Sequence, residues 1–349
     1  EIGCTFLSNQ SISPQNIITD KLIISNKIQL GSGEYSLIEG IEINSSNLIL
    51  DCDGAKLKGY GVGTGINISN VSNILIDGCD FENYDFGISV SNSDNINVTG
   101  TRIFSSGNAV ELINSSNIEL SKSDLYGDNL AVFIDENSFN SNIMYNKIDK
   151  NSTTPGPSLI ILGNISNVVN NIILNGIQIK GKLKNITENI IQGSITTPLV
   201  LIKSGELNTV QRNDIGNSNT HAILVENNSI NNEITQNSIH DTITGILSVD
   251  SPSNIISYNS INSESDPIII ANSNNYRVLY NNIISEDGSG VMSYYSDGIN
   301  ISHNIIKNKP SIFYSDFIDN VVLFGIILTN SQNNSLTNNS LIGNFHHAG

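Results

Sequence analysis

The chain has 349 residues and a formal net charge of −17, because 16 Lys and Arg stand against 33 Asp and Glu. This sign of charge excludes the usual class of nucleic-acid-binding proteins, which need basic residues to contact phosphates. Asn (55), Ile (59) and Ser (47) make up about 46 % of the sequence, a bias that ordinary enzymes do not show. Since 38 % of the residues are hydrophobic, the chain can bury a core and is not predicted to be disordered. It has no run of 18 apolar residues, so no membrane span is predicted.

The first 40 residues precede a regular repeat and are predicted to form an N-terminal cap, residues 1–40. The stretch from Ile17 to Leu30 supplies apolar residues that could cover the open end of the first repeat unit, where strand edges would otherwise be unpaired. The chain begins with Glu1 rather than Met, which suits a processed secreted protein and equally a trimmed chain.

Three cysteines, Cys4, Cys52 and Cys79, lie in the first quarter of the chain. Their odd number allows at most one intramolecular disulfide. We expect Cys4 to bond with Cys52, with Cys79 as the alternative partner, so that the cap is joined to the first coils; free buried thiols are the competing interpretation. Closely spaced Cys-x-x-Cys pairs are absent, so the sequence does not predict a zinc site.

From residue 41 onward, a short sequence pattern recurs about every 22 to 25 residues. Each unit contains an Asn followed by alternating aliphatic residues, as in residues 47–50, 73–76, 95–98 and 117–120. A second turn-forming residue then precedes another short apolar stretch, and a third apolar register recurs twelve times between Gly65 and Leu328. Three short strands in so few residues cannot form a sandwich of hairpins, but they fit one coil of a solenoid.

We therefore predict an all-β fold, a parallel β-helix of about 12 coils that occupies residues 41–349. Ile fills the inner face of each strand, and Asn or Gly adopts left-handed backbone conformations at the corners. Asn side chains at equivalent corners can also stack as hydrogen-bonded ladders between coils. Two longer steps of the repeat predict insertions near residues 138–157 and 307–323.

The segment from Asn47 to Gly54, followed by Lys58–Gly61 and Gly65–Ile68, resembles the opening coil of right-handed parallel β-helix proteins of the pectin-lyase-like superfamily. The repeat is similar to that of NosD-like proteins and of adhesin-like or S-layer-associated surface proteins. The resemblance runs from about Ile41 to Ile342 and implies right-handed coiling. It implies little about function, because the superfamily includes lyases, hydrolases, phage spikes, adhesins and lattice proteins.

Two stacks of charged residues are predicted on the early coils. Asp51 and Asp77 fall at equivalent positions of neighbouring coils, where two carboxylates could bind Ca²⁺ or diverge as solvated turn residues. Asp80, Arg102 and Asp124 fall at a second set of equivalent positions. They are interpreted as a surface salt-bridge ladder. The alternative is a pectate-lyase-like site, in which carboxylates bind Ca²⁺ and the Arg acts as the base.

No catalytic constellation is visible in the sequence. The histidines, His221, His240, His303, His346 and His347, are scattered along the chain without stacked acids. The Asn-Thr-Asp, Asp-Asp, Gly-His-Gly and Arg-Ile-Lys motifs of polygalacturonase-like sites are absent. We therefore expect no catalytic residue and no cofactor other than Ca²⁺. Copper delivery, as in NosD-like proteins, is disfavoured because the chain has only 2 Met and its histidines are dispersed.

Carbohydrate is a candidate partner, although Trp is absent. Stacking on a sugar would have to come from tyrosines such as Tyr276, Tyr280, Tyr294 and Tyr295. Asn-x-Ser/Thr sequons are no more frequent than chance predicts, yet Asn44 at a corner and Asn151 in an insertion are candidate glycosylation sites if the protein is secreted.

The low share of charged residues, 14 %, and the repeat favour an extracellular or cell-surface structural or adhesive protein. We expect it to pack with copies of itself in a sheath, filament or S-layer-like lattice. The alternatives are a polysaccharide lyase or glycoside hydrolase of the same fold, and a segment of a virus or phage fibre.

Overall fold

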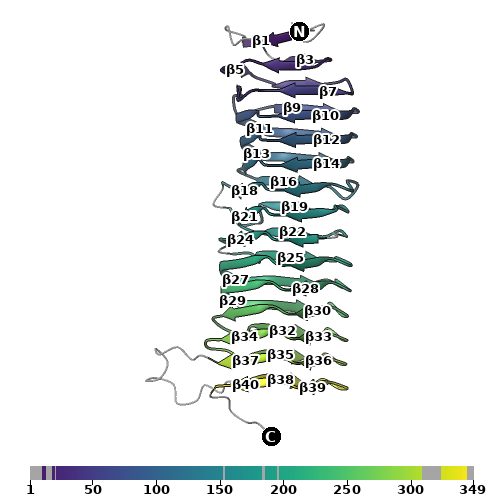
Figure 1. Ribbon diagram of the computed structural model, residues 1–349, viewed down its shortest axis with the longest axis vertical. Coiled ribbons are helices and arrows are strands. Elements are labelled where there is room, and N and C mark those ends of the chain that lie inside the picture. The colour runs from purple at the N-terminus through teal and green to yellow at the C-terminus, as the bar shows by residue number, and fades with distance from the viewer. Residues whose placement is uncertain are drawn as a thin grey trace. The chain divides into compact units, whose positions relative to one another are not determined.

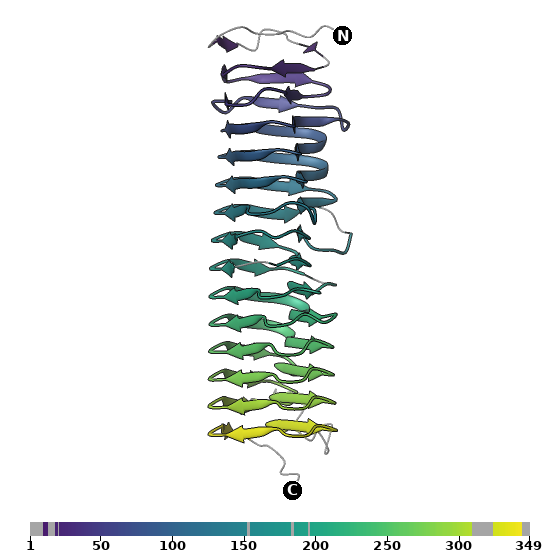
Figure 2. The same ribbon diagram turned by 90° about the vertical axis from the view of Figure 1, so that its right-hand side faces the viewer.

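The computed structural model describes residues 10–12, 18–19, 21–151, 154–182, 185–194, 196–308 and 324–343. These residues form strands and turns with no helix among them, so none of them belongs to a helix long and apolar enough to cross a membrane. The chain divides into two compact units, Glu1–Leu174 and Asn175–Gly349, coloured purple to teal and teal to yellow in Figure 1 and Figure 2. Each unit is a parallel β-helix whose coils contribute strands to three faces, which confirms the predicted fold class of about 12 coils.

In the first unit, every pairing between coils is parallel. The first face contains β1 (Gln10–Ile12), β4 (Ile28–Leu30), β7 (Leu48–Asp51), β10 (Ser72–Asp77), β12 (Asp94–Thr99), β14 (Ser116–Ser121), β17 (Asn142–Met144) and β20 (Asn167–Val169). The second face contains β2 (Ile18–Thr19), β5 (Glu34–Leu37), β8 (Lys56–Lys58), the start of β11 (Asp80–Ser91) and of β13 (Arg102–Ile113), β15 (Asp124–Gly127), β18 (Lys147–Lys150) and β21 (Ile172–Leu174). The third face contains β3 (Leu22–Ile24), β6 (Ile41–Ile43), β9 (Thr64–Ser69), the ends of β11 and β13, β16 (Leu130–Ile134) and β19 (Leu159–Ile161).

The second unit repeats this arrangement. Its first face contains β23 (Asn185–Thr187), β26 (Thr209–Gln211), β28 (Glu233–Thr235), β30 (Ile255–Ser257), β33 (Arg277–Leu279), β36 (Asn300–Ser302) and β39 (Ser335–Thr337). Its second face contains β24 (Ile190–Gln192), the start of β27 (Asp214–Glu226) and of β29 (Ser238–Val249), β31 (Ser260–Ser263), β34 (Asn282–Ser285), β37 (Ile305–Asn308) and β40 (Ser340–Ile342). Its third face contains β22 (Ile177–Ile179), β25 (Val200–Lys203), the ends of β27 and β29, β32 (Ile268–Ala271), β35 (Val291–Tyr294) and β38 (Ile326–Thr329).

Aliphatic side chains stack in columns through the interior. On the third face of the first unit, Ile66, Ile88, Val110 and Val132 lie in register on successive coils, and each is at most 1 % exposed. Along each strand, the residues on either side of a core residue point outward, because successive side chains of a strand alternate between its two faces. Inward columns therefore form the core, and outward columns form the surface. Burial of these β-branched side chains supplies most of the stabilisation, at about 25 cal/mol per Å² of apolar surface.

Asparagine holds the exposed corners between coils. Asn73 and Asn95 have φ values of 60° and 55°, in the left-handed region that Asn tolerates better than most residues. The amide of Asn73 donates to Oδ1 of Asn47 at 2.8 Å, and that of Asn95 donates to Oδ1 of Asn73 at 2.7 Å. The predicted corner ladder is therefore present in the structure.

A second, buried asparagine ladder runs through the second unit. Its central members, Asn213, Asn237, Asn259 and Asn281, are at most 2 % exposed. In each step, the backbone N–H and the side-chain amide of one Asn both donate to Oδ1 of the Asn on the next coil. The other amide hydrogen goes to a backbone carbonyl, such as that of Val210, so the buried polar groups at this corner are satisfied.

The described part of the predicted cap is itself a coil. β3 pairs in register with β6, and β5 with β8, because Leu22, Ile24 and Leu37 follow the same inward alternation as the later coils. Residues 1–9, 13–17 and 20 lie outside the described residues.

The predicted insertion near residues 138–157 contains two regular strands, β17 and β18, which pair in register with β14 and β15. Most of the extra length therefore falls in the connection from Lys150 to Leu159. Of the segment 307–323, Lys307 and Asn308 belong to β37, and residues 309–323 lie outside the described residues.

Candidate functional site

A row of alternating charges marks the second face of the first unit. One outward residue from each of six successive coils joins it, in strands whose neighbouring residues Leu57, Phe81 and Ile103 point into the core. We call this the charged row, and it consists of Glu34, Lys56, Asp80, Arg102, Asp124 and Lys147. The predicted Asp80, Arg102 and Asp124 ladder is the middle of this row, and its sign changes at every coil.

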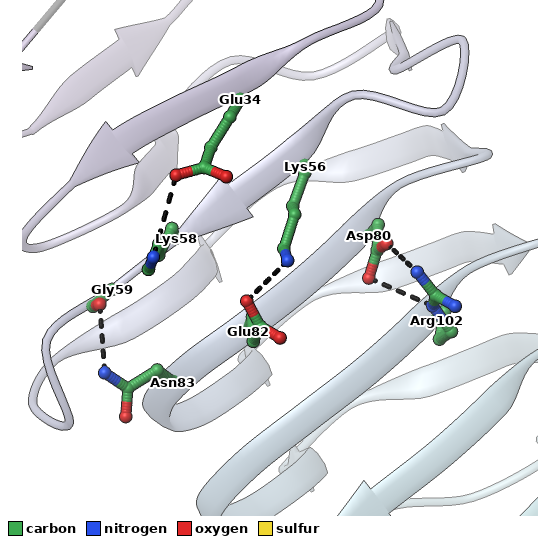
Figure 3. Close-up of polar contacts among 8 residues, drawn as sticks. All are labelled: Glu34, Lys56, Lys58, Gly59, Asp80, Glu82, Asn83 and Arg102. Carbon is green, nitrogen blue, oxygen red and sulfur yellow. Dashed lines mark hydrogen bonds and ion pairs between the residues drawn. The ribbon is translucent and has the colours of Figure 1, made fainter.

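Ion pairs engage three cations of this face, Lys56, Lys58 and Arg102, as Figure 3 shows. Arg102 contacts Asp80 with two nitrogens, and its Nε lies 3.2 Å from Asp80 Oδ1. This carboxylate raises the pKa of Arg102. Lys56 Nζ lies 2.6 Å from Glu82 Oε2, and Lys58 Nζ lies 3.7 Å from Glu34 Oε1. Exposed pairs of this kind contribute little to stability, so their main effect is on the charge that a ligand meets.

Beside the charged row lies a shallow groove that contains two stacked aromatic rings. Phe104 and Tyr126 occupy equivalent outward positions of β13 and β15, with ring centroids 4.5 Å apart and an interplanar angle of 1°. Phe104 remains 39 % exposed. The groove has a volume of about 220 Å³ and is lined by Glu82, Asn83, Phe104, Ser105, Ser106, Tyr126, Asp128 and Asn151.

Cations flank the two rings without lining the groove. The Arg102 guanidinium lies 5.9 Å from the centre of the Phe104 ring, and Lys147 Nζ lies 5.2 Å from the centre of the Tyr126 ring. Contact with Tyr126 and the nearby Asp124 and Asp149 raises the pKa of Lys147. Aromatic rings bordered by carboxylates, amides and hydroxyls can bind a polyhydroxylated molecule.

Sequence reasoning did not identify Phe104 and Tyr126. Both follow predicted ladder residues, Arg102 and Asp124, by two positions, and they are separated by 22 residues, one coil of the repeat. That spacing was sufficient to place their rings side by side, because residues two apart in a strand share a face.

The predicted cation ligands Asp51 and Asp77 lie in register on β7 and β10. Asp51 Oδ1 accepts a hydrogen bond of 3.1 Å from the backbone N–H of Asp53, and Thr99 follows Asp77 in the same column. Among the residues that the structure describes, no group of three or more His, Cys, Asp or Glu could hold a metal ion. Ca²⁺ takes six to eight oxygen ligands, so two carboxylates supply only part of a site, and the Ca²⁺ assignment stays a prediction.

The disulfide differs from the expected one, because Cys52 bonds with Cys79 and not with Cys4. The corner after β7 has four residues, Cys52–Ala55, where the next coil has only Gly78 and Cys79. The longer corner brings Cys52 next to Cys79, with a Cα–Cα distance of 4.9 Å. The bridge therefore joins two neighbouring coils, and Cys4 lies outside the described residues.

The two candidate glycosylation sites are both exposed. Asn44 directly follows β6 at a corner. Asn151 lines the groove, and its Nδ2 donates to Asp128 Oδ1 at 3.3 Å. A glycan on Asn151 would take the place of one of the two hydrogens on this Nδ2.

The tyrosines singled out for sugar stacking have different environments. Tyr276 is wholly buried, and its hydroxyl donates to Ser248 and accepts from Asn254 at 2.9 Å, so it cannot meet a ligand. Tyr280 stacks between Tyr258 and His303 at centroid distances of 5.0 and 4.7 Å. Two aromatic rings therefore flank Tyr280, whereas among the described residues Phe104 and Tyr126 each stack on one ring only.

A histidine and two aspartates form a cluster on the second face of the second unit, so the expectation that no acid stacks near a histidine is wrong for His240. His240 Nε2 lies 3.0 Å from Asp214 Oδ1, and its Nδ1 lies 2.9 Å from Asp241 Oδ2. Burial lowers the pKa of His240, but the hydrogen bonds and charges of Asp241 and Asp214 outweigh it, so the pKa is raised overall. With both ring nitrogens in contact with carboxylates, this imidazole lacks the free nitrogen that a general base needs.

Two family models match the chain. The one described as "Periplasmic copper-binding protein (NosD)" matches residues 8–229, and the one described as "Right handed beta helix region" matches residues 175–341. The second match confirms the predicted right-handed coil. No curated protein matches the chain.

Solved structures that are similar to this chain have low sequence identity to it. The Azotobacter vinelandii mannuronan C-5 epimerase AlgE4 A-module is 11 % identical over 93 % of this chain and 91 % of that chain, with a TM-score of 0.45. A point mutant of the periplasmic alginate epimerase AlgG is 14 % identical over 80 % and 78 %, with a TM-score of 0.43. PfbA, a surface adhesin of Streptococcus pneumoniae, is 12 % identical over 82 % and 85 %, with a TM-score of 0.43.

Proposed function

Because the chain belongs to the family described as periplasmic copper-binding protein (NosD), we propose that it works outside the cytoplasm, in the periplasm or at the cell surface. The Cys52–Cys79 disulfide supports this location, since structural disulfides form and persist in oxidising compartments.

Copper does not fit the described side chains. Soft thioether, thiolate or imidazole groups must converge to hold copper. Both described cysteines are used in the disulfide, and both nitrogens of His240 are bound to aspartates. Met144 and Met292 belong to different units. Among the described residues no group of three or more His, Cys, Asp or Glu could hold a metal ion, so the copper binding in the family's name does not fit this part of the chain.

The function that the geometry supports best is adhesive binding of a carbohydrate in the groove of the first unit. The observation that carries it is the stacked pair Phe104 and Tyr126, with Glu82 and Asp128 lining the same groove. Aromatic surface together with a few polar groups is the usual composition of a small-ligand site. Two carboxylates also line this groove, and glycosidases use carboxylates in pairs, so cleavage must be measured beside binding.

Binding can be tested with the full chain against a panel of soluble oligosaccharides by calorimetry. Tyr126→Ala should weaken binding about tenfold or more, because it removes half of the aromatic pair. Tyr258→Ala is the control, since Tyr258 is also a stacked tyrosine on the surface but lies in the second unit. Equal losses for both variants, or no binding to any member of the panel, would contradict the proposal. Release of products from any oligosaccharide would favour the lyase or hydrolase alternative.

A second candidate role is the predicted assembly with copies of the same chain. In the last described coil, the core-type residues Leu336 and Leu341 are 49 % and 48 % exposed, and among the described strands β38, β39 and β40 pair on one side only. An open edge of parallel strands accepts a strand of matching spacing. A second copy offers one in β1, which among the described strands pairs only with β4.

The oligomeric state tests this second role. Leu341→Lys should shift the protein from multimers to monomers in light scattering, because a charge cannot be buried at an end-to-end contact. A wild-type protein that stays monomeric at about millimolar concentration would refute assembly through this edge.

A further inference from the structure

The groove's hydrogen-bonding groups and charges define which carbohydrates it can accept. We propose that the groove binds a neutral, hydroxyl-rich polysaccharide and rejects polyuronates. This inference rests on the proposed binding function and adds the class of ligand.

Several hydrogen-bond donors of the groove are already used within the protein. One N–H of Asn83 donates to the carbonyl of Gly59 at 3.2 Å, and the Ser106 hydroxyl donates to the carbonyl of Tyr84 at 3.2 Å. Asn151 donates to Asp128. What these residues and the two carboxylates offer to a ligand is mainly lone pairs.

A ligand for such a surface must bring donors of its own. The hydroxyl groups of a neutral sugar each supply one O–H donor, whereas an ionised carboxylate only accepts hydrogen bonds. Carboxylates that accept from hydroxyls form hydrogen bonds stronger than those between neutral groups. The side chains of Glu82 and Asp128 therefore suit sugar hydroxyls and leave a uronate carboxylate without a partner.

The charges point the same way. The described residues of the groove lining include two carboxylates and no cation. The neighbouring cations Lys56 and Arg102 are paired with Glu82 and Asp80, and Lys147 faces the Tyr126 ring between acidic neighbours. A uronate would have to break one of these contacts while meeting a protein of net charge −17, which repels polyanions at a distance.

The test compares hexasaccharides of equal length by calorimetry with the full chain: mannohexaose, cellohexaose and laminarihexaose as neutral probes, hexamannuronate and hexagalacturonate as acidic probes, and chitosan hexamer as a basic probe. We expect at least one neutral probe to bind at least about tenfold more tightly than either acidic probe. We also expect its affinity to change less than about twofold between about 50 and 500 mM salt.

Variants separate the groove from the rest of the surface. Asp128→Asn should weaken neutral binding about tenfold, and Asp128→Lys should allow the acidic probes to bind. Glu233→Gln, an exposed acid on the first face of the second unit, should change neither result. Circular dichroism checks that each variant keeps its strands.

Tight binding of a uronate by the wild type, or binding of the chitosan hexamer alone, would overturn the inference and leave carbohydrate binding intact. Failure of all six probes to bind would instead overturn the proposed function, and the inference with it.

Discussion

The buried asparagine ladder gives the sharpest test of what stabilises the coils. Replacing Asn237 by Ala removes an oxygen that accepts from the backbone N–H and the amide of Asn213, both at 3.0 Å. It also removes the donor to the Val210 carbonyl at 2.8 Å. Three buried polar groups then lose this partner, since Asn237 is 2 % exposed, and Asn259 Oδ1 loses one of its two donors but keeps the backbone N–H of residue 237.

Each orphaned buried group costs about 1–3 kcal/mol. Three groups would give ~3–9 kcal/mol, and water entering the space of the missing amide reduces the loss toward the lower limit. We therefore expect Asn237→Ala to lower the free energy of unfolding by about 3–5 kcal/mol.

The control is Asn300→Ala in the same unit. Asn300 faces outward on β36, and its Oδ1 is buried without a hydrogen-bond partner, so its removal should change stability by less than about 0.5 kcal/mol. Asn237→Ser should fall between the two, because Ser123 serves as the acceptor for Thr101 at the equivalent corner of the first unit.

Urea unfolding followed by circular dichroism measures the overall change. Hydrogen exchange at the amide of Asn213 measures the local one, which matters because long repeat arrays do not always unfold in one step. Equal losses for Asn237→Ala and Asn300→Ala, with Asn213 still protected, would refute the reasoning that burial sets the value of these hydrogen bonds.

Three further outcomes are expected. Replacing Cys52 and Cys79 by Ser should lower the free energy of unfolding by about 3–4 kcal/mol, because the bridge closes a loop with a sequence separation of 27; calorimetric melting with and without reductant should show the same difference for the wild type and none for the variant. The pKa of His240 is raised above 6.5 in the folded state, so its stabilisation is full below that value and is lost as pH rises through the folded pKa; the stability difference between wild type and His240→Gln should be larger at about pH 6 than at about pH 9, and a difference independent of pH would contradict this. Gly127→Ala should cost about 3 kcal/mol or more, because a Cβ there would lie 1.9 Å from the Leu130 carbonyl oxygen, whereas Gly54→Ala has open space around it and should cost about 1–2 kcal/mol from its left-handed backbone alone.

The fold could be predicted from the sequence because it is periodic. A spacing of 22 residues fixes which residues meet on adjacent coils, so the column Asp80, Arg102 and Asp124 was predictable and is confirmed by the strand register. The same spacing of 22 residues pairs Phe104 with Tyr126. The candidates for sugar stacking included only tyrosines, and one of them, Tyr276, is buried.

Features that break the period were not predictable. The pairing of Cys52 with Cys79 depends on two additional residues in one corner, and no average spacing reveals where such residues will place a side chain. The groove also depends on local irregularity, since the register shifts beside Glu82 and Tyr84 in β11. The repeat therefore predicts which residues stack on adjacent coils. It does not predict the disulfide or the groove, because both lie where the regular spacing is interrupted.

Because the buried ladder is regularly spaced, a whole coil can be removed from the second unit without interrupting the repeat. Asn237, Asn259 and Asn281 are each 22 residues apart, and both Asn237 and Asn259 are followed by Ser and Ile. Excising residues 238–259 would join Asn237 to Ser260 and restore the same local sequence. The ladder would then contain one Asn fewer, and Asn237 would donate to Oδ1 of Asn281. Recombination between such repeats can thus shorten or lengthen this protein by whole coils without creating a new junction.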